Sequence, residues 1–153
     1  MALVDGLPSV ILNNVAQLIQ KKVPAKIAPL VEQFSDLLYG NISTLDLAQR
    51  NDSDMYGATL SLWNSLNDHQ DNTPVIKVFN PQVSKHGWKS SHTIIEVIIS
   101  DMPFLVDSLR IALSRMSLSP HLMLNCPIKI IRDKNNQICQ LSTASDNSIK
   151  STS

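Results

Sequence analysis

The stretch from Asp101 to Ser108 combines residue types that could build a small turn before a helix. It reads Asp-Met-Pro-Phe-Leu-Val-Asp-Ser and follows a segment rich in β-branched residues. Asp101 is a suitable helix cap, and Pro103 suits the first helical turn because its fixed φ matches a helix and its missing amide costs no hydrogen bond there. Capping and packing therefore explain these residues without a ligand. A carboxylate ligand at the free amides of such a helix start is the less favoured alternative.

Two other groups of reactive side chains favour packing over chemistry. His86, Trp88 and His92 lie close in sequence, but two histidines without a nearby cysteine or carboxylate make an incomplete metal site. His121 and Cys126 are five residues apart on an expected strand, so their side chains would point to opposite faces. The sequence thus predicts no metal site and no catalytic residue.

Composition excludes several classes of protein. The 13 Lys and Arg residues balance the 13 Asp and Glu residues, so the basic surplus of a phosphate-binding surface is missing and we expect no nucleic-acid partner. Only 4 glycines are present, too few for a dinucleotide-binding loop, and the 2 cysteines lack the paired spacing of a zinc site. No signal peptide and no apolar run of about twenty residues is recognisable. We expect a soluble cytoplasmic protein without a membrane partner.

The first half of the chain, residues 1–72, is predicted to be a helical region. Apolar residues recur there at helical spacing in four segments, separated by proline or by short polar breaks. Pro29 suits an early turn of the second helix, and Gly40 is predicted to end that helix in a left-handed conformation. The predicted N-terminal caps of the first, third and fourth helices are Ser9, Thr44 and Ser53.

The second half changes to strands and one helix. Strands are predicted at 75–79 and 93–99, a helix from Asp101 to Met116, and a hairpin formed by 121–131 and 138–141. On that helix, Asp107 and Arg110 are spaced for an ion pair. The fold class is therefore α+β, with the helical region followed by a partial ferredoxin-like antiparallel sheet under one covering helix. Residues 73–143 would form this unit, and residues 144–153 a disordered tail.

The turn at Asp101 also resembles a known ligand-binding motif. It is similar to the Asp-x-Pro-Gly-x-Leu turn of ACT domains, regulatory modules that bind an amino acid between the first strand and the following helix. Phe104 stands where that pattern has glycine. The resemblance implies a possible effector-binding turn made of Asp101, Met102, Pro103 and Phe104.

Three stretches together resemble the N-terminal region of the large bacterial NAD-dependent glutamate dehydrogenases. The most specific is the run Asp101–Ser108, because eight residues of mixed chemistry rarely recur by chance. The order and spacing of all three agree with the family. The other two stretches are 46–50 with 54–58 and Trp63, and 78–81 with 86–88 and 92–93.

This resemblance implies a noncatalytic regulatory or assembly segment of an ACT-like kind, truncated before its sheet is complete. The parent enzyme would oxidise L-glutamate to 2-oxoglutarate and ammonia with NAD, using residues far downstream, so this segment alone would bind no NAD and be inactive. Expected partners are the downstream domains, a further copy of the chain, or an amino-acid effector. Two alternatives stay open: a free-standing ACT-like amino-acid sensor and a homo-oligomerisation module.

Overall fold

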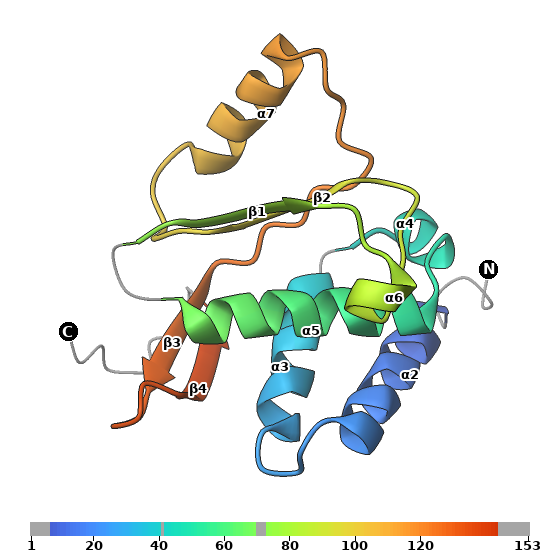
Figure 1. Ribbon diagram of the computed structural model, residues 1–153, viewed down its shortest axis with the longest axis vertical. Coiled ribbons are helices and arrows are strands. Elements are labelled where there is room, and N and C mark those ends of the chain that lie inside the picture. Colours follow the sequence, from blue (N-terminus) through green and yellow to red (C-terminus); the bar gives the residue numbers. More distant parts are fainter. Residues whose placement is uncertain (1–6, 41, 70–72, 144–153) are drawn as a thin grey trace.

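The computed structural model describes residues 7–40, 42–69 and 73–143, and within them the α+β class is confirmed (Figure 1). Four helices come first along the described chain, and the strands follow them with two further helices between them. The elements are α2 (Leu7–Lys22), α3 (Ala28–Tyr39), α4 (Thr44–Ala48), α5 (Asp52–Asp68), β1 (Val75–Phe79), α6 (Val83–His86), β2 (Ile94–Ile98), α7 (Leu105–Arg115), β3 (Ile128–Arg132) and β4 (Ile138–Thr143). The predicted tail at 144–153 lies outside the described residues, and the division at residue 72 stays a prediction.

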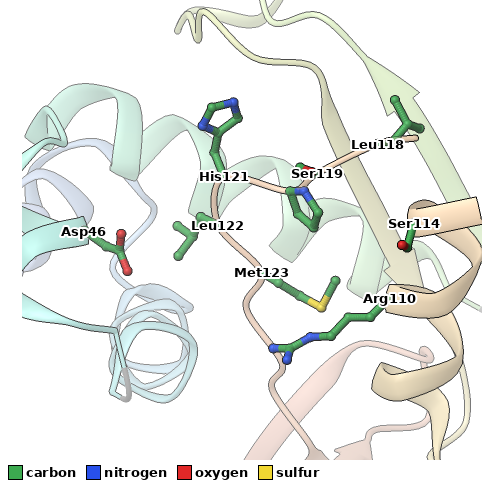
Figure 2. A pocket seen from close by; sticks show the side chains of 9 residues that line it. Asp46, Arg110, Ser114, Leu118, Ser119, His121, Leu122 and Met123 are labelled. Carbon is green, nitrogen blue, oxygen red and sulfur yellow. The ribbon is translucent and has the colours of Figure 1, made fainter. Parts of the chain in front are cut away.

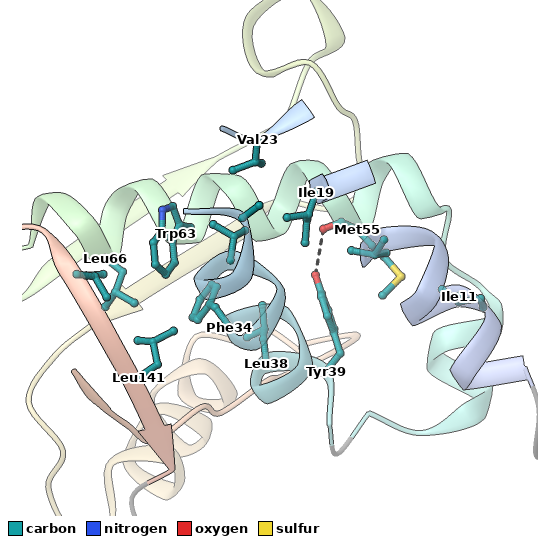
Figure 3. Packing of buried hydrophobic residues seen from close by; sticks show 14 of the residues in the cluster. Ile11, Ile19, Val23, Phe34, Leu38, Tyr39, Met55, Trp63, Leu66 and Leu141 are labelled. Carbon is teal, nitrogen blue, oxygen red and sulfur yellow. Dashed lines mark hydrogen bonds between the residues drawn. The ribbon is translucent and has the colours of Figure 1, made fainter. Parts of the chain in front are cut away.

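The main core lies between α2, α3 and α5, whose apolar stripes face one another (Figure 3). Val15, Val31 and Phe34 are almost wholly buried there. Phe34 packs on Trp63 of α5 with ring centroids 5.7 Å apart and a tilted geometry. Leu141 of β4 joins the same cluster. The core therefore draws on both the helical region and the strands, which ties the two halves of the chain together.

The ends of the helices correct four sequence predictions. The first helix begins at Leu7, so Ser9 lies within its first turn and is not its cap. Ser43, not Thr44, caps α4 by accepting the amide of Asp46, and Asn51, not Ser53, caps α5. Each true cap is the residue with extended backbone just before the helix, which is the geometry that capping requires. Gly40 is right-handed at φ −59°, so it does not form the predicted left-handed end.

β1 and β2 form an antiparallel hairpin that contacts α5, and a partly buried polar cluster joins them. Lys77 and Glu96 are directly opposite each other in the register. Glu96 is buried and accepts hydrogen bonds from Ser61 Oγ at 2.7 Å and Ser65 Oγ at 3.1 Å. Lys77 Nζ donates to Ser65 Oγ at 2.7 Å. Because every charge has a polar partner, this cluster fixes how the hairpin sits on α5.

β3 and β4 form a second antiparallel hairpin, so the described strands make two separate sheets and not the single predicted sheet. Arg132 joins this hairpin to the end of α5. Its guanidinium donates to the carbonyls of Leu66 at 2.7 Å, Asn67 at 3.0 Å and His69 at 3.2 Å. The Leu66 carbonyl also accepts the His69 amide at 3.2 Å, and a cation is favourable at a helix C-terminus, where the last carbonyls have no complete set of helical partners. The interaction anchors β3 to the helical region.

α7 lies on the side of the β1–β2 hairpin opposite α5 (Figure 1). None of its residues is buried, although the sequence predicted an inward-packed stripe. Ile111 is 54% exposed and Met116, just after the helix, is 68% exposed. The hairpin is also open on its outer face, where Ile76 and Val78 are 66% and 64% exposed. The predicted helix is present, but none of its residues is buried, and the residues of its predicted stripe within the helix are half-buried apart from the exposed Ala112.

Candidate effector-binding turn

The candidate turn connects β2 to α7, and its backbone differs from the predicted cap. The helix begins at Leu105, so Asp101 and Pro103 precede it. Asp101 therefore does not cap α7, and Phe104 occupies the cap position without a side-chain hydrogen bond. The Phe104 carbonyl instead accepts the amide of Ser108 at 2.9 Å, which closes the first helical turn.

Phe104 has left-handed backbone dihedrals, φ 63° and ψ 14°. This conformation costs a non-glycine residue about 1–2 kcal/mol, because Cβ crowds the carbonyl oxygen. A glycine adopts it freely, which gives a physical reason for glycine at this position of the ACT pattern. In this chain a phenylalanine adopts the left-handed conformation at that position. The Phe104 side chain is 78% exposed, so its ring lies mostly in solvent.

Three of the four predicted site residues line one shallow groove of about 220 Å³. Pro103 does not line it. The groove is smaller than most small-molecule sites, which occupy about 300–1,000 Å³. Its residues are Asp101, Met102, Phe104, Leu105, Val106, Asp107 and Asn125.

The charges in this groove oppose an anionic ligand. Asp101 and Asp107 are both carboxylates, and no cationic residue lines the groove. Two nearby negative charges repel a ligand carboxylate and offset the attraction of the free helix amides. The groove is thus suited to a neutral or cationic group. Its role as an effector site stays a prediction.

The loop between the strands of the first hairpin packs as the sequence predicts. Trp88 is 5% exposed and lies directly against Gly57 of α5. A Cβ atom at Gly57 would be 2.3 Å from Trp88 Cγ, so this contact requires glycine. The Phe79 ring lies edge-on to the Trp88 ring, with centroids 6.1 Å apart. It also contacts the His86 ring, with centroids 5.2 Å apart. Two of the sequence stretches singled out above are therefore in contact.

Short α6 within this loop is missing from the sequence prediction. Its apolar residues are too few to show a helical period over four residues. Gly87 ends α6 with φ 78°, the left-handed geometry that glycine adopts without strain. His86 Nδ1 accepts the Gln82 amide at 3.0 Å, which holds the helix closed. This histidine is therefore engaged in loop structure.

Two other histidines form a contact that sequence spacing did not reveal. The rings of His92 and His121 stack with centroids 4.0 Å apart and 14° between their planes. Parallel rings cannot both direct a lone pair at one ion, and no group of three metal-ligating side chains occurs within the described residues. Burial raises the pKa of the Cys126 thiol, which is the opposite of what an activated nucleophile needs. None of these side chains forms a recognisable catalytic arrangement.

Comparison with known protein families identifies the family to which this chain belongs. Residues 34–153 match the family described as "Glutamate dehydrogenase, ACT1 domain". The chain belongs to this family. The match begins within α3 and includes the candidate turn and both hairpins, so the resemblance seen in the short stretches extends over most of the chain.

Two curated relatives are NAD-specific glutamate dehydrogenases. The protein of Halomonas elongata is 36% identical over 128 residues, which are 84% of this chain and 8% of the relative. The protein of Pseudomonas aeruginosa is 37% identical over 116 residues, which are 76% of this chain and 7% of the relative. The chain thus spans less than a tenth of the length of these relatives. No solved structure matches it, and no described helix is long and apolar enough to cross a membrane.

Proposed function

We propose that this chain is a noncatalytic regulatory or assembly segment at the N-terminus of a cytoplasmic NAD-dependent glutamate dehydrogenase. The observation that carries the proposal is the family match over residues 34–153. Both cysteines are free thiols, which is in keeping with a reducing compartment. The parent enzyme would convert L-glutamate, NAD and water to 2-oxoglutarate, ammonia and NADH.

The chemistry of that reaction would reside in other parts of the enzyme. Hydride transfer to NAD needs a fold that holds the dinucleotide, commonly through a glycine-rich turn at a helix start. The 4 glycines of this chain do not form such a turn. In this proposal the segment binds no NAD itself.

The partner we propose for its open apolar surface is the downstream part of the same enzyme. Ile76, Val78 and Ile95 share the outer face of the β1–β2 hairpin and are 66%, 64% and 49% exposed. Contiguous apolar side chains of this kind are typical of an interface. We call these three residues the outer hairpin face. The relatives carry more than nine-tenths of their length beyond the matched segment, so ample chain would be present to cover it.

The proposal is tested first with the purified chain alone. We expect no NADH formation from L-glutamate and NAD, and no saturable heat when NAD is titrated into the chain by calorimetry. Turnover, abolished by denaturing the chain, would refute a noncatalytic role. Light scattering at several concentrations tests the alternative of a homo-oligomerisation module: a concentration-dependent dimer lost on Val78→Asp would favour that alternative.

A further inference from the structure

One pair of stacked rings joins two segments that are far apart in the sequence. His92 lies in the loop before β2, and His121 lies in the extended segment that follows α7. Both side chains are exposed, yet their ring centroids are only 4.0 Å apart and their planes are 14° from parallel. The stack therefore ties the segment after α7 to the first hairpin.

Little else holds α7 and the segment after it in place. Residues 119–127 make no hydrogen bond with the described part of the chain, and of these residues only Leu124 and Cys126 pack against the main core. Within α7 no residue is buried, and the predicted ion pair between Asp107 and Arg110 does not form in the described chain. The position of this part of the molecule thus depends strongly on the stacked rings.

The charged groups around the stack do not compensate a second charge on it. Lys89 lies in the loop before β2, and Asp54 of α5 accepts the Lys89 backbone amide at 3.3 Å. Asp46 of α4 and Arg110 of α7 line a hollow of about 450 Å³ together with His121 (Figure 2). None of these four charged side chains makes an ion pair or a hydrogen bond with either ring in the described structure. Two charges of each sign therefore surround the rings.

We propose that this stack is a pH-sensitive latch, which holds α7 and the segment after it against the loop before β2 and opens in acid. Histidine side chains typically change charge between about pH 5 and 8. Two rings that carry at most one charge can stay stacked, whereas two imidazolium rings repel each other. Because the open form takes up the second proton more readily, falling pH shifts the protein towards it. At the observed distance of 4.0 Å, two unit charges in water favour the open form about fivefold.

The latch acts on the helix that follows the candidate turn. Leu105, Val106 and Asp107 of α7 form one side of the turn groove, so a movement of α7 would change that groove as well. The inference does not depend on the proposed enzyme, because the opening is measured on the chain itself.

The test is NMR of the isotope-labelled full chain between pH 8 and pH 5, followed through the backbone amides of residues 105–118. His121→Ala removes one ring and supplies the amide shifts of the open form at each pH. In the unchanged chain, the ratio of open to closed forms should rise about fivefold from pH 8 to pH 5. His121→Phe and His92→Phe each keep two rings with at most one charge, so both variants should stay closed at pH 5.

His86→Gln is the matched control, because His86 is an exposed histidine between the same two strands but does not join the stack. Glutamine keeps a side-chain acceptor for the Gln82 amide, and this variant should open in acid as the unchanged chain does. The amides of α2 and α3 report whether the core stays folded at pH 5. The proposal is overturned if the ratio does not change with pH, if His121→Phe opens as much as the unchanged chain, if His86→Gln abolishes the opening, or if the core signals change together with those of α7.

Discussion

Replacing Gly57 with alanine should destabilise the protein, although alanine is normally favoured over glycine in a helix. The new Cβ would lie 2.3 Å from Trp88 Cγ and 2.5 Å from Trp88 Cβ and Cδ1. Carbon atoms in contact are normally about 3.5–4.0 Å apart. The crowded atoms are close to the Trp88 backbone, so rotating the ring cannot remove the overlap.

The magnitude follows from two opposing effects. Overpacking a core costs about 1–3 kcal/mol, and we expect the upper end here. The higher helix propensity of alanine stabilises the helix by about 1 kcal/mol. The free energy of unfolding should therefore fall by about 1–2 kcal/mol in Gly57→Ala.

A double-mutant cycle measured by urea unfolding tests this reasoning. Trp88→Gly removes all three crowded atoms, so in that background Gly57→Ala should raise stability by about 1 kcal/mol. All variants should be measured in the same concentration of a stabilising osmolyte, because losing a buried tryptophan itself costs about 3–5 kcal/mol.

Gly87→Ala is the control for a purely backbone effect. Gly87 has φ 78° and nothing within 4 Å of an added Cβ, so its cost comes from strain alone. It should destabilise by about 1–2 kcal/mol. The packing account is refuted if Gly57→Ala is neutral or stabilising, or if its effect is the same with tryptophan and with glycine at position 88.

Three further predictions concern the contacts that join the elements. Glu96→Gln should lower the free energy of unfolding by about 1–3 kcal/mol in urea unfolding, because the buried bonds from Ser61 and Ser65 lose their charged acceptor. Arg132→Lys should cost a similar amount and speed hydrogen exchange at the end of α5, because lysine cannot reach several carbonyls at once; unchanged exchange there would argue against the anchor. Burial raises the pKa of the Tyr39 hydroxyl above its usual value of 10.0, so the stability that this shift contributes is full below pH 10 and falls as pH rises through the folded value. Tyr39→Phe should reduce that alkaline loss, and an identical loss in both proteins would exclude Tyr39 as its source.

The sequence predicts most elements because their apolar residues follow clear periods. The helical spacing of Val31, Phe34 and Leu38 places α3, and the β-branched run before Asp101 places β2. Helix ends are harder to predict, since neighbouring residues such as Asn51 and Ser53 are both good caps and only the backbone geometry decides between them.

Other features depend on contacts between distant parts of the chain, which periodicity does not contain. The packing of Trp88 on Gly57 and the stacking of His92 on His121 each join separate segments. The hollow lined by Asp46 and Arg110 arises in the same way, from residues that are more than sixty positions apart in sequence. A helical period likewise shows that α7 has an apolar stripe, but not that this stripe is only half-buried in the described chain.

The most direct test of the central proposal is to exchange the matching segment of the Halomonas elongata enzyme for this chain and to measure NADH formation and molecular mass. We expect catalytic constants near those of the parent enzyme. Val78→Asp, on the outer hairpin face, should then alter the molecular mass of the assembled enzyme in solution, or its regulation. It should leave the KM for NAD unchanged. Val83→Asp, at a valine of similar exposure (62% against 64%), is the control and should have no effect. Equal behaviour of the two variants, or a changed KM for NAD in Val78→Asp, would contradict a noncatalytic docking segment.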